Sequence, residues 1–260
     1  PKSSYALNVD ELTLGRGLRQ LMQALVPADV PPPSRLVLRA NAHGTGYDAS
    51  TQVDLKSDLG DLKGTAKAHN WKGFVPGQLN MELTANDIDA TRLTGDTALG
   101  PMSFTLVANG DRLHEASREA HLLLTPTVLT YLGNDLSHLV LQADAAGDSL
   151  RTELTSDAYA AAFRLRTTGP WPVAGDSLVL AFDIAVERLD LQELGLTPYE
   201  LNMDGPLAGR IALLPDVRGR YVLEAPGLRM FNATRTFAFE HLALNGLLDA
   251  DSTALELDCD

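Results

Sequence analysis

Two histidines and two glutamates lie close together in the sequence and could bind a metal ion: His114, Glu115, Glu119 and His121. A zincin helix places its two histidines at i and i+4, so that both imidazole nitrogens reach one zinc ion. His114 and His121 are instead seven positions apart, and the other histidines are scattered. We therefore expect solvated charged side chains here and no metal site.

An acidic segment near the end of the chain resembles a calcium-binding loop. Asp249 and Asp251 occupy the first and third positions of such a loop, and Asp260 occupies the twelfth. The sharp turn of an EF-hand loop requires glycine at the sixth position, where this chain has Ala254. We expect no calcium site.

Paired carboxylates are the groups that glycoside hydrolysis would need. The candidate pairs are Asp87 with Asp89 and Asp183 with Glu187, and they fall at outward positions of alternating segments. The sequence contains no nucleophile elbow, no phosphate-binding loop and no dinucleotide-binding fingerprint. We expect a protein that is not an enzyme and that uses no cofactor.

Charge and cysteine content restrict the partners. The chain has 34 acidic and 21 basic residues, a formal net charge of −13, which would repel the phosphate backbone of a nucleic acid. Cys259 is the single cysteine, so no internal disulfide can form. With 45% apolar residues, the chain can bury enough apolar surface to fold.

Neither end of the sequence resembles a natural terminus. The chain begins Pro1-Lys2-Ser3 without a signal-peptide core, and it stops within an alternating segment. No window approaches 18 uninterrupted apolar residues. We expect a segment of a longer protein, with any membrane anchor outside this segment.

Alternation of apolar and polar residues dominates the chain and predicts β-strands with one apolar face and one polar face. It is clearest in four segments, residues 79–85, 102–108, 139–143 and 178–186. Turn sequences such as Ala-Asn-Gly-Asp at 108–111 recur between such segments. We expect sequential hairpins in a mainly β, antiparallel sheet.

Helical spacing appears in two places. Leu18, Leu21, Met22, Leu25 and Val26 follow the i, i+3, i+4 pattern of one amphipathic helix, at about residues 16–26, which Pro27 closes. A shorter helical stretch is predicted from Thr127 to Leu132, after Pro126 and before Gly133.

An internal repeat of about 100 residues emerges when Leu79–Leu93 is laid over Leu180–Leu194 without a gap. Apolar residues coincide, Asp89 meets Asp190, and Trp71 and Trp171 precede the two copies at nearly equal distance. We expect a β-rich region over residues 1–170 and a second β-rich repeat region over 171–260, continuous with the first.

A short pattern recurs within these segments: two apolar residues separated by two others, then a third apolar residue after one more. The four occurrences begin at Val9, Ala85, Val186 and Phe239. Two polar residues between inward positions predict a β-bulge, which adds bend and twist to a strand. Three of the patterns lead to a further leucine, which predicts short helical turns. The expected fold is therefore a curved, elongated antiparallel sheet.

The segments Leu79–Leu93 and Leu180–Leu194 resemble repeats of the AsmA-like family of bacterial envelope proteins, including its TamB branch, and residues 55–65 have a similar character. The resemblance lies in the periodicity of leucine, aspartate and glycine over most of the chain. It implies a protein anchored in the inner membrane of a diderm bacterium. Such a protein extends through the periplasm and rolls its sheet into an open trough that carries phospholipid acyl chains.

The same resemblance implies the partners and the site. The partners would be phospholipid acyl chains and outer-membrane assembly proteins, with no nucleic acid. The residues expected to line the groove are Leu79, Met81, Leu83, Met102, Phe104, Leu106, Leu180, Phe182, Ile184 and Val186.

Two other interpretations fit the same pattern. The apolar faces could pack against each other in a closed β-sandwich that serves as a scaffold or adhesion module. A carbohydrate-binding module is a further alternative, although only 6% of the residues are aromatic. Alternation alone does not distinguish an open apolar face from a closed one.

Overall fold

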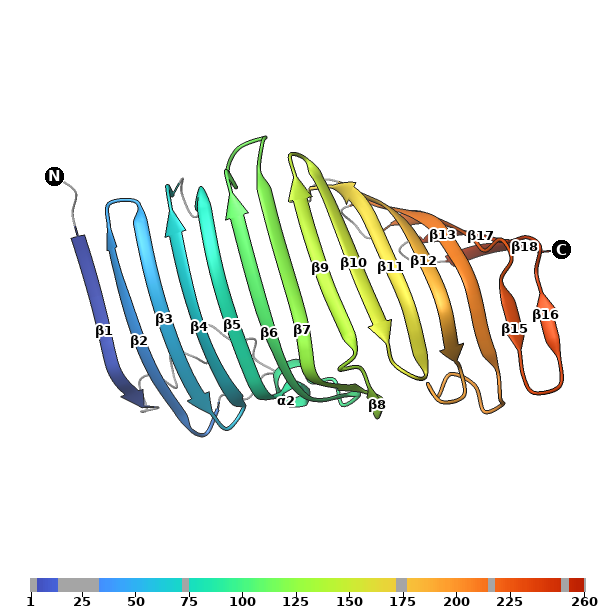
Figure 1. Ribbon diagram of the computed structural model, residues 1–260, viewed down its shortest axis with the longest axis horizontal. Helices are drawn as coiled ribbons and strands as arrows, with labels where there is room; N and C mark the ends of the chain where they lie inside the picture. The colour runs from blue at the N-terminus through green and yellow to red at the C-terminus, as the bar shows by residue number, and fades with distance from the viewer. Residues whose placement is uncertain are drawn as a thin grey trace. The chain divides into compact units, whose positions relative to one another are not determined.

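The computed structural model describes residues 4–13, 33–71, 75–171, 177–214, 218–248 and 253–259 (Figure 1). The chain is mainly β, with 71% of it in strands, and the strands belong to one antiparallel sheet of 18. Two compact units divide the chain, unit 1 from Pro1 to His138 and unit 2 from Leu139 to Asp260. The predicted mainly β, antiparallel fold is confirmed, whereas the predicted regions 1–170 and 171–260 stay a prediction.

Unit 1 is a meander in which each strand pairs antiparallel with the next one along the chain. Its strands are β1 (Ser4–Thr13), β2 (Leu36–Thr45), β3 (Asp48–Ser57), β4 (Gly60–His69), β5 (Gln78–Asp89), β6 (Leu99–Asp111), β7 (Glu119–Tyr131) and β8 (Asn134–Asp135). The tight β2–β3 turn contains Gly46 at φ 60°, in the left-handed region that glycine tolerates.

Unit 2 continues as a meander and then adds a side hairpin. Its strands are β9 (Leu139–Ala146), β10 (Ser149–Asp157), β11 (Ala161–Pro170), β12 (Leu178–Asp190), β13 (Asn202–Leu213), β14 (Gly219–Glu224), β15 (Arg229–Phe231), β16 (Thr236–Ala238), β17 (Leu242–Leu248) and β18 (Thr253–Cys259). Strands β9 to β14 pair in chain order, β17 pairs with β14, and β18 pairs with β17. The β15–β16 hairpin joins the sheet because β15 pairs with β13.

Bulges occur at three of the four predicted patterns. The strand register shifts between Val9 and Leu12 in β1, between Ala85 and Ile88 in β5, and between Val186 and Leu189 in β12. The fourth pattern, from Phe239, carries no such shift. Each bulge inserts one extra residue into its strand. The apolar residues before and after the bulge therefore point to the same face of the sheet.

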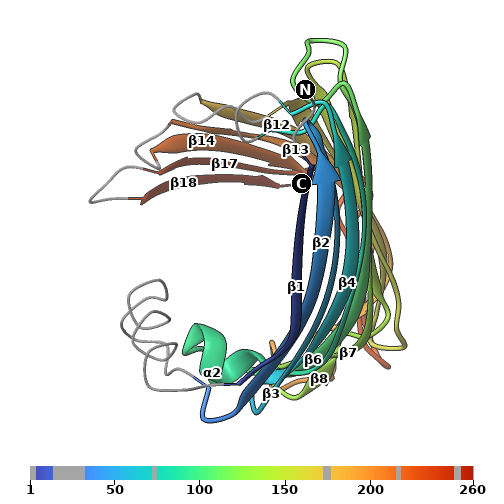
Figure 2. The same ribbon diagram turned by 90° about the vertical axis from the view of Figure 1, so that its left-hand side faces the viewer.

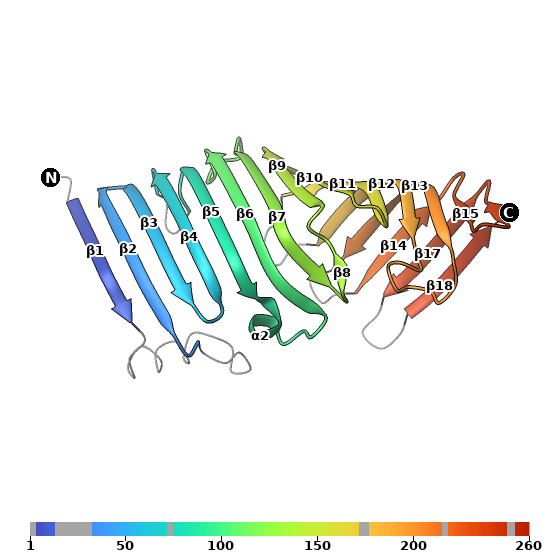
Figure 3. The ribbon, with the colours of Figure 1, turned by 60° about the horizontal axis from the view of Figure 1, so that its bottom comes forward.

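One short helix lies in the described part of the chain, α2 (Ala90–Thr94), which directly follows β5 (Figure 3). The Asp89 carboxylate caps it by accepting a hydrogen bond from Arg92 N at 3.0 Å, and Gly95 ends it at φ 76°. A single helical turn follows β12, where the Leu194 N–H donates to the Asp190 carbonyl at 3.1 Å. No helix in the described ranges is long and apolar enough to cross a membrane.

The prediction of a helical stretch from Thr127 to Leu132 is wrong, since this segment is the end of β7. Pro126 lies in the strand opposite Phe104, at a register shift that leaves Thr127 unpaired. Leu132 and Gly133 have φ values of 50° and 83° and form the tight turn into β8. The glycine that looked like a helix cap is therefore a hairpin turn residue.

The predicted amphipathic helix at residues 16–26 lies outside the described residues. Among the described residues, no large side chain is fully buried. The most buried apolar residues are mostly small: Ala68, Ala85 and Ala90 in unit 1, and Ala145, Val186, Ala225 and Leu228 in unit 2.

Candidate functional site

Strand β5 shows how the sequence sorts its side chains. Leu79, Met81, Leu83 and Ala85 alternate with Asn80, Glu82 and Thr84, so the two sets point to opposite faces of the sheet. The register with β6 places Leu83 opposite Leu106 and Ala85 opposite Phe104. After the bulge, Ile88 faces Met102. The six groove candidates of unit 1 therefore share one face.

This face extends over unit 1 as cross-strand rows from β1 to β7, which we call the apolar face of unit 1. One row runs through Val9, Ala40, Val53, Gly64, Leu83, Leu106 and Leu124. The rows on either side run through Leu12, Leu38, Leu55, Leu62, Ala85, Phe104 and Pro126, and through Leu7, Ala42, Thr51, Ala66, Met81, Ala108 and Leu122. None of these rows contains a charged side chain.

Unit 2 has an equivalent surface, the apolar face of unit 2. One row joins Leu141, Leu154, Leu165, Ile184 and Leu207 across β9 to β13. A neighbouring row joins Ala143, Thr152, Thr167, Phe182, Gly209, Leu223, Leu244 and Leu257 and reaches β18. The unit 2 candidates, Leu180, Phe182, Ile184 and Val186, alternate along β12 and share this face.

Among the described residues, the side chains of the apolar faces are less buried than those of a tightly packed two-layer core. Nine of the ten groove candidates are partly exposed, and Val186 alone is buried, at 6%. At the edge of unit 1, Leu7 and Tyr5 are 59% and 48% exposed. A closed sandwich core would bury large apolar residues almost completely.

Glycines on the apolar faces lie beneath aromatic rings of the neighbouring strand. Tyr5 covers Gly44, Phe182 covers Gly209 and Tyr221 covers Gly246, since a Cβ on each glycine would meet the ring. The Tyr5 hydroxyl also donates to the Asp48 carbonyl at 3.1 Å. These ring-over-glycine pairs keep the face smooth and apolar where a strand lacks a side chain.

The opposite face of each unit is polar and charged. In unit 1, Arg39, Asp54 and Lys63 face one another across β2, β3 and β4. In unit 2, Glu153 forms ion pairs with Arg164 at 3.1 Å and with Arg166 at 3.0 Å. The hydrogen bond that Arg166 donates to the Glu153 carboxylate raises the pKa of Arg166, with a smaller contribution from the charge of Asp183. In each unit, the sheet therefore has an apolar face and an ionic face.

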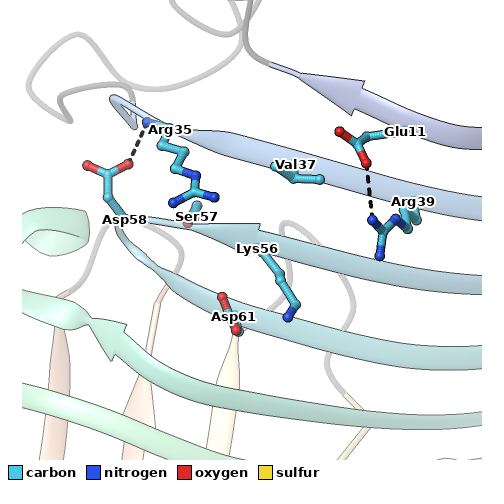
Figure 4. A pocket seen from close by; sticks show the side chains of 8 residues that line it. All are labelled: Glu11, Arg35, Val37, Arg39, Lys56, Ser57, Asp58 and Asp61. Carbon is cyan, nitrogen blue, oxygen red and sulfur yellow. Dashed lines mark hydrogen bonds and ion pairs between the residues drawn. The ribbon is translucent and has the colours of Figure 1, made fainter.

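A cavity of about 460 Å³ lies on the polar face of unit 1, where β2, β3 and β4 end or begin (Figure 4). Asp58 accepts hydrogen bonds from the Arg35 backbone N–H at 2.9 Å and from the Ser34 hydroxyl at 2.8 Å. These hydrogen bonds, the one from Arg35 foremost, lower the pKa of Asp58. Arg39 and Glu11 form an ion pair at 3.1 Å at one end of the cavity. Acidic and basic side chains are balanced here, and no nucleophile and base are brought together.

The four residues first considered for a metal site do not converge. His114 and Glu115 lie in the β6–β7 connection, whereas Glu119 and His121 lie in β7. Glu119 pairs with Arg112 at 2.5 Å. No group of three potential metal ligands occurs among the residues that the structure describes. Asp249, Asp251 and Asp260 lie outside those residues.

The carboxylates considered for glycoside hydrolysis lie at a helix cap, at bulges and on the polar face of the sheet. Asp89 caps α2, and Glu187 is exposed in the β12 bulge between Val186 and Leu189. Asp183 lies opposite Arg166 on the polar face. Asp87 stands at the β5 bulge with φ 51°.

Comparisons of this chain with known proteins found no match. No protein-family model matches the chain, no curated protein matches it, and no solved structure matches its fold.

Proposed function

We propose that this chain is a non-catalytic periplasmic segment of an AsmA- or TamB-like envelope protein, and that its apolar faces bind phospholipid acyl chains. The observation that carries the proposal is the set of uncharged cross-strand rows, whose large side chains remain partly exposed. The binding would serve phospholipid transport or outer-membrane assembly.

Aliphatic and aromatic side chains suit this ligand. An acyl chain laid along a row of leucine, methionine and phenylalanine leaves water without needing any hydrogen bond from the protein. At about 0.8 kcal/mol per buried CH₂, one long chain gains on the order of 10 kcal/mol. A surface of this kind requires no fixed catalytic geometry.

A curved sheet would turn an apolar face into a groove, and two observations favour curvature. Bulges interrupt β1, β5 and β7 of unit 1 and would bend these strands. Figure 2 views unit 1 from its β1 edge, and the concave side of its strands is the side on which α2 lies. An acyl chain on the inner side of such a bow would contact more apolar surface than on a flat sheet.

The charged face supports the same proposal from the other side. Ion pairs such as Arg166 with Glu153 keep that face hydrated, so lipid contact would be restricted to the apolar face. The net charge of −13 would repel an anionic polymer. Outer-membrane assembly proteins, and an inner-membrane anchor outside this chain, belong to the proposal through the family resemblance.

Two neighbouring residues of β12 provide a matched test. Ile184 lies on the apolar face of unit 2, and Ala185 lies on the polar face, where it is exposed. Ile184→Asp and Ala185→Asp place the same charge one residue apart on opposite faces. A fluorescent phospholipid is titrated into the parent chain and both variants, after circular dichroism has shown that each is folded.

We expect saturable binding by the parent chain and by Ala185→Asp. Ile184→Asp should bind at least about tenfold more weakly, because a carboxylate beneath an acyl chain has no compensating partner. Equal loss in both variants would contradict the assignment of the face. Absence of binding by the folded parent would instead favour a closed scaffold.

A further inference from the structure

The cavity on the polar face of unit 1 contains more charged side chains than its own ion pairs use. Three basic and three acidic side chains line it: Arg35, Arg39, Lys56, Glu11, Asp58 and Asp61 (Figure 4). Glu11 is paired with Arg39 at 3.1 Å. Asp58 is paired with Arg92 of α2 at 3.3 Å and also accepts the hydrogen bonds from the Arg35 backbone and from Ser34. These contacts leave the side chains of Arg35, Lys56 and Asp61.

These three side chains have no partner in the part of the chain that the structure describes. Neither the Arg35 guanidinium, the Lys56 ammonium nor the Asp61 carboxylate forms an ion pair or a side-chain hydrogen bond there. Arg35 and Lys56 are exposed, and Asp61 is half-buried. Two positive charges and one negative charge thus give the cavity a local surplus of one positive charge, on a chain whose net charge is −13.

Strand pairing brings the three charged groups onto one small area. Val37 of β2 faces Lys56 of β3, and Lys56 faces Asp61 of β4. Arg35 lines the same cavity two residues before Val37, so it stands diagonal to Lys56. Diagonal neighbours have Cα atoms about 7–8 Å apart, within the reach of long side chains. The side chains of Arg35 and Lys56 can therefore contact one ligand group, with Asp61 beside it.

The chemistry of these groups indicates the ligand. Arginine offers a planar fork of N–H donors that matches phosphate oxygens, and lysine adds a compact positive charge. Asp61 would repel a bare phosphate, but it would attract an ammonium group that a short carbon chain links to the phosphate. The methylene groups of that short chain would lie against Val37. The cavity volume of about 460 Å³ is within the usual range of small-molecule sites.

We infer that this cavity binds a phosphate ester that carries an amino group, of the phosphoethanolamine class. Arg35 and Lys56 bind the phosphate, and Asp61 accepts hydrogen bonds from the ammonium group. The same chemistry occurs in a free phosphate monoester and in the diester headgroup of a phospholipid. The inference concerns the polar face of unit 1, so it does not rest on the binding of acyl chains by the apolar faces.

Equilibrium dialysis of soluble ligands against the full chain tests the site without any acyl chain. The ligands are O-phosphoethanolamine, glycerophosphoethanolamine and inorganic phosphate. We expect saturable binding of O-phosphoethanolamine, about threefold to fivefold tighter than that of inorganic phosphate, which has no ammonium group for Asp61. Equally tight binding of glycerophosphoethanolamine would support a lipid headgroup as the source of the ligand. Binding of the monoester alone would support a free phosphate ester.

Three substitutions assign the roles of the side chains, after circular dichroism has shown that each variant is folded. Lys56→Gln should weaken the binding of both O-phosphoethanolamine and inorganic phosphate about tenfold, because it removes a charged donor to the phosphate. Asp61→Asn should weaken the binding of O-phosphoethanolamine alone, since inorganic phosphate loses only a repulsive charge. Lys67→Gln is the matched control, an exposed lysine of β4 outside the cavity, and should change neither affinity.

Absence of saturable O-phosphoethanolamine binding by the folded chain would overturn the inference. Equal losses in Lys56→Gln and Lys67→Gln would also overturn it, because they would mean that surface charge attracts the ligand without a site. An equal effect of Asp61→Asn on both ligands would rule out the contact with the ammonium group. None of these outcomes affects the lipid titration with Ile184→Asp, so this inference and the proposed function can fail separately.

Discussion

The backbone N–H of Asp87 donates a hydrogen bond to the Oγ of Ser103 across β5 and β6, at 2.9 Å. Asp87 is at φ 51°, in the bulge between Ala85 and Ile88, where its N–H faces a side chain and not a strand carbonyl. Ser103 is 5% exposed. The serine hydroxyl therefore replaces the backbone partner that the bulge removes.

Removing this hydroxyl should destabilise unit 1. Ser103→Ala leaves the Asp87 N–H without its partner in a part-buried bulge, which should cost on the order of 1 kcal/mol. Urea unfolding measures the loss. Thr105→Ala, two residues along β6, is the control and should change the free energy of unfolding by less than about 0.5 kcal/mol. Equal effects of both substitutions would show that the bulge does not depend on Ser103.

Acid should weaken the turn after β3 through Asp58. Hydrogen bonds from the Arg35 N–H and from Ser34 hold the folded pKa of Asp58 below its ordinary value of 3.8. A depressed folded pKa contributes stability above pH 3.8, and this contribution is lost as the pH falls toward the folded pKa.

The comparison of wild type with Asp58→Asn isolates this contribution. The difference in free energy of unfolding between the two should be constant from pH 7 to pH 5 and should shrink below pH 3.8. Urea titrations at several pH values measure it. A difference that stays constant down to the lowest pH would mean that Asp58 ionises equally easily in the folded and unfolded chain.

The ring-over-glycine pair of β14 and β17 should be sensitive to one added methyl group. A Cβ on Gly246 would overlap the Tyr221 ring, so Gly246→Ala should cost about 1–3 kcal/mol by overpacking. In a Tyr221→Ala background the same substitution should cost much less. A double-mutant cycle in urea measures the coupling, and additive costs would show that the ring is free to move aside.

Local patterns in the sequence predicted much of the fold. The alternation in residues 79–85 and 178–186 predicted the facing of β5 and β12 because successive side chains of a strand always point to opposite sides. The spacing of Ala85 and Ile88 predicted a bulge, since an extra residue is the simplest way to keep both on one face. The groove candidates consequently lie together on the predicted faces.

Other features escaped the sequence because they depend on strand pairing. A proline followed seven residues later by a glycine fits both a short helix and a bulged strand that ends in a hairpin turn. Pairing with β6 decided that the segment between Pro126 and Gly133 forms a strand. The role of Ser103 follows from its position opposite the Asp87 bulge, which lies 16 residues away in the sequence.

The sequence by itself determined that the chain forms antiparallel strands with an apolar and a polar face, because side-chain alternation is a local property with a fixed period of two. Tertiary structure decided which residues meet across strands, which glycines lie under rings, and that the large apolar side chains remain partly exposed. These properties arise from contacts between distant segments. Alternation is compatible equally with a covered face and with an uncovered one.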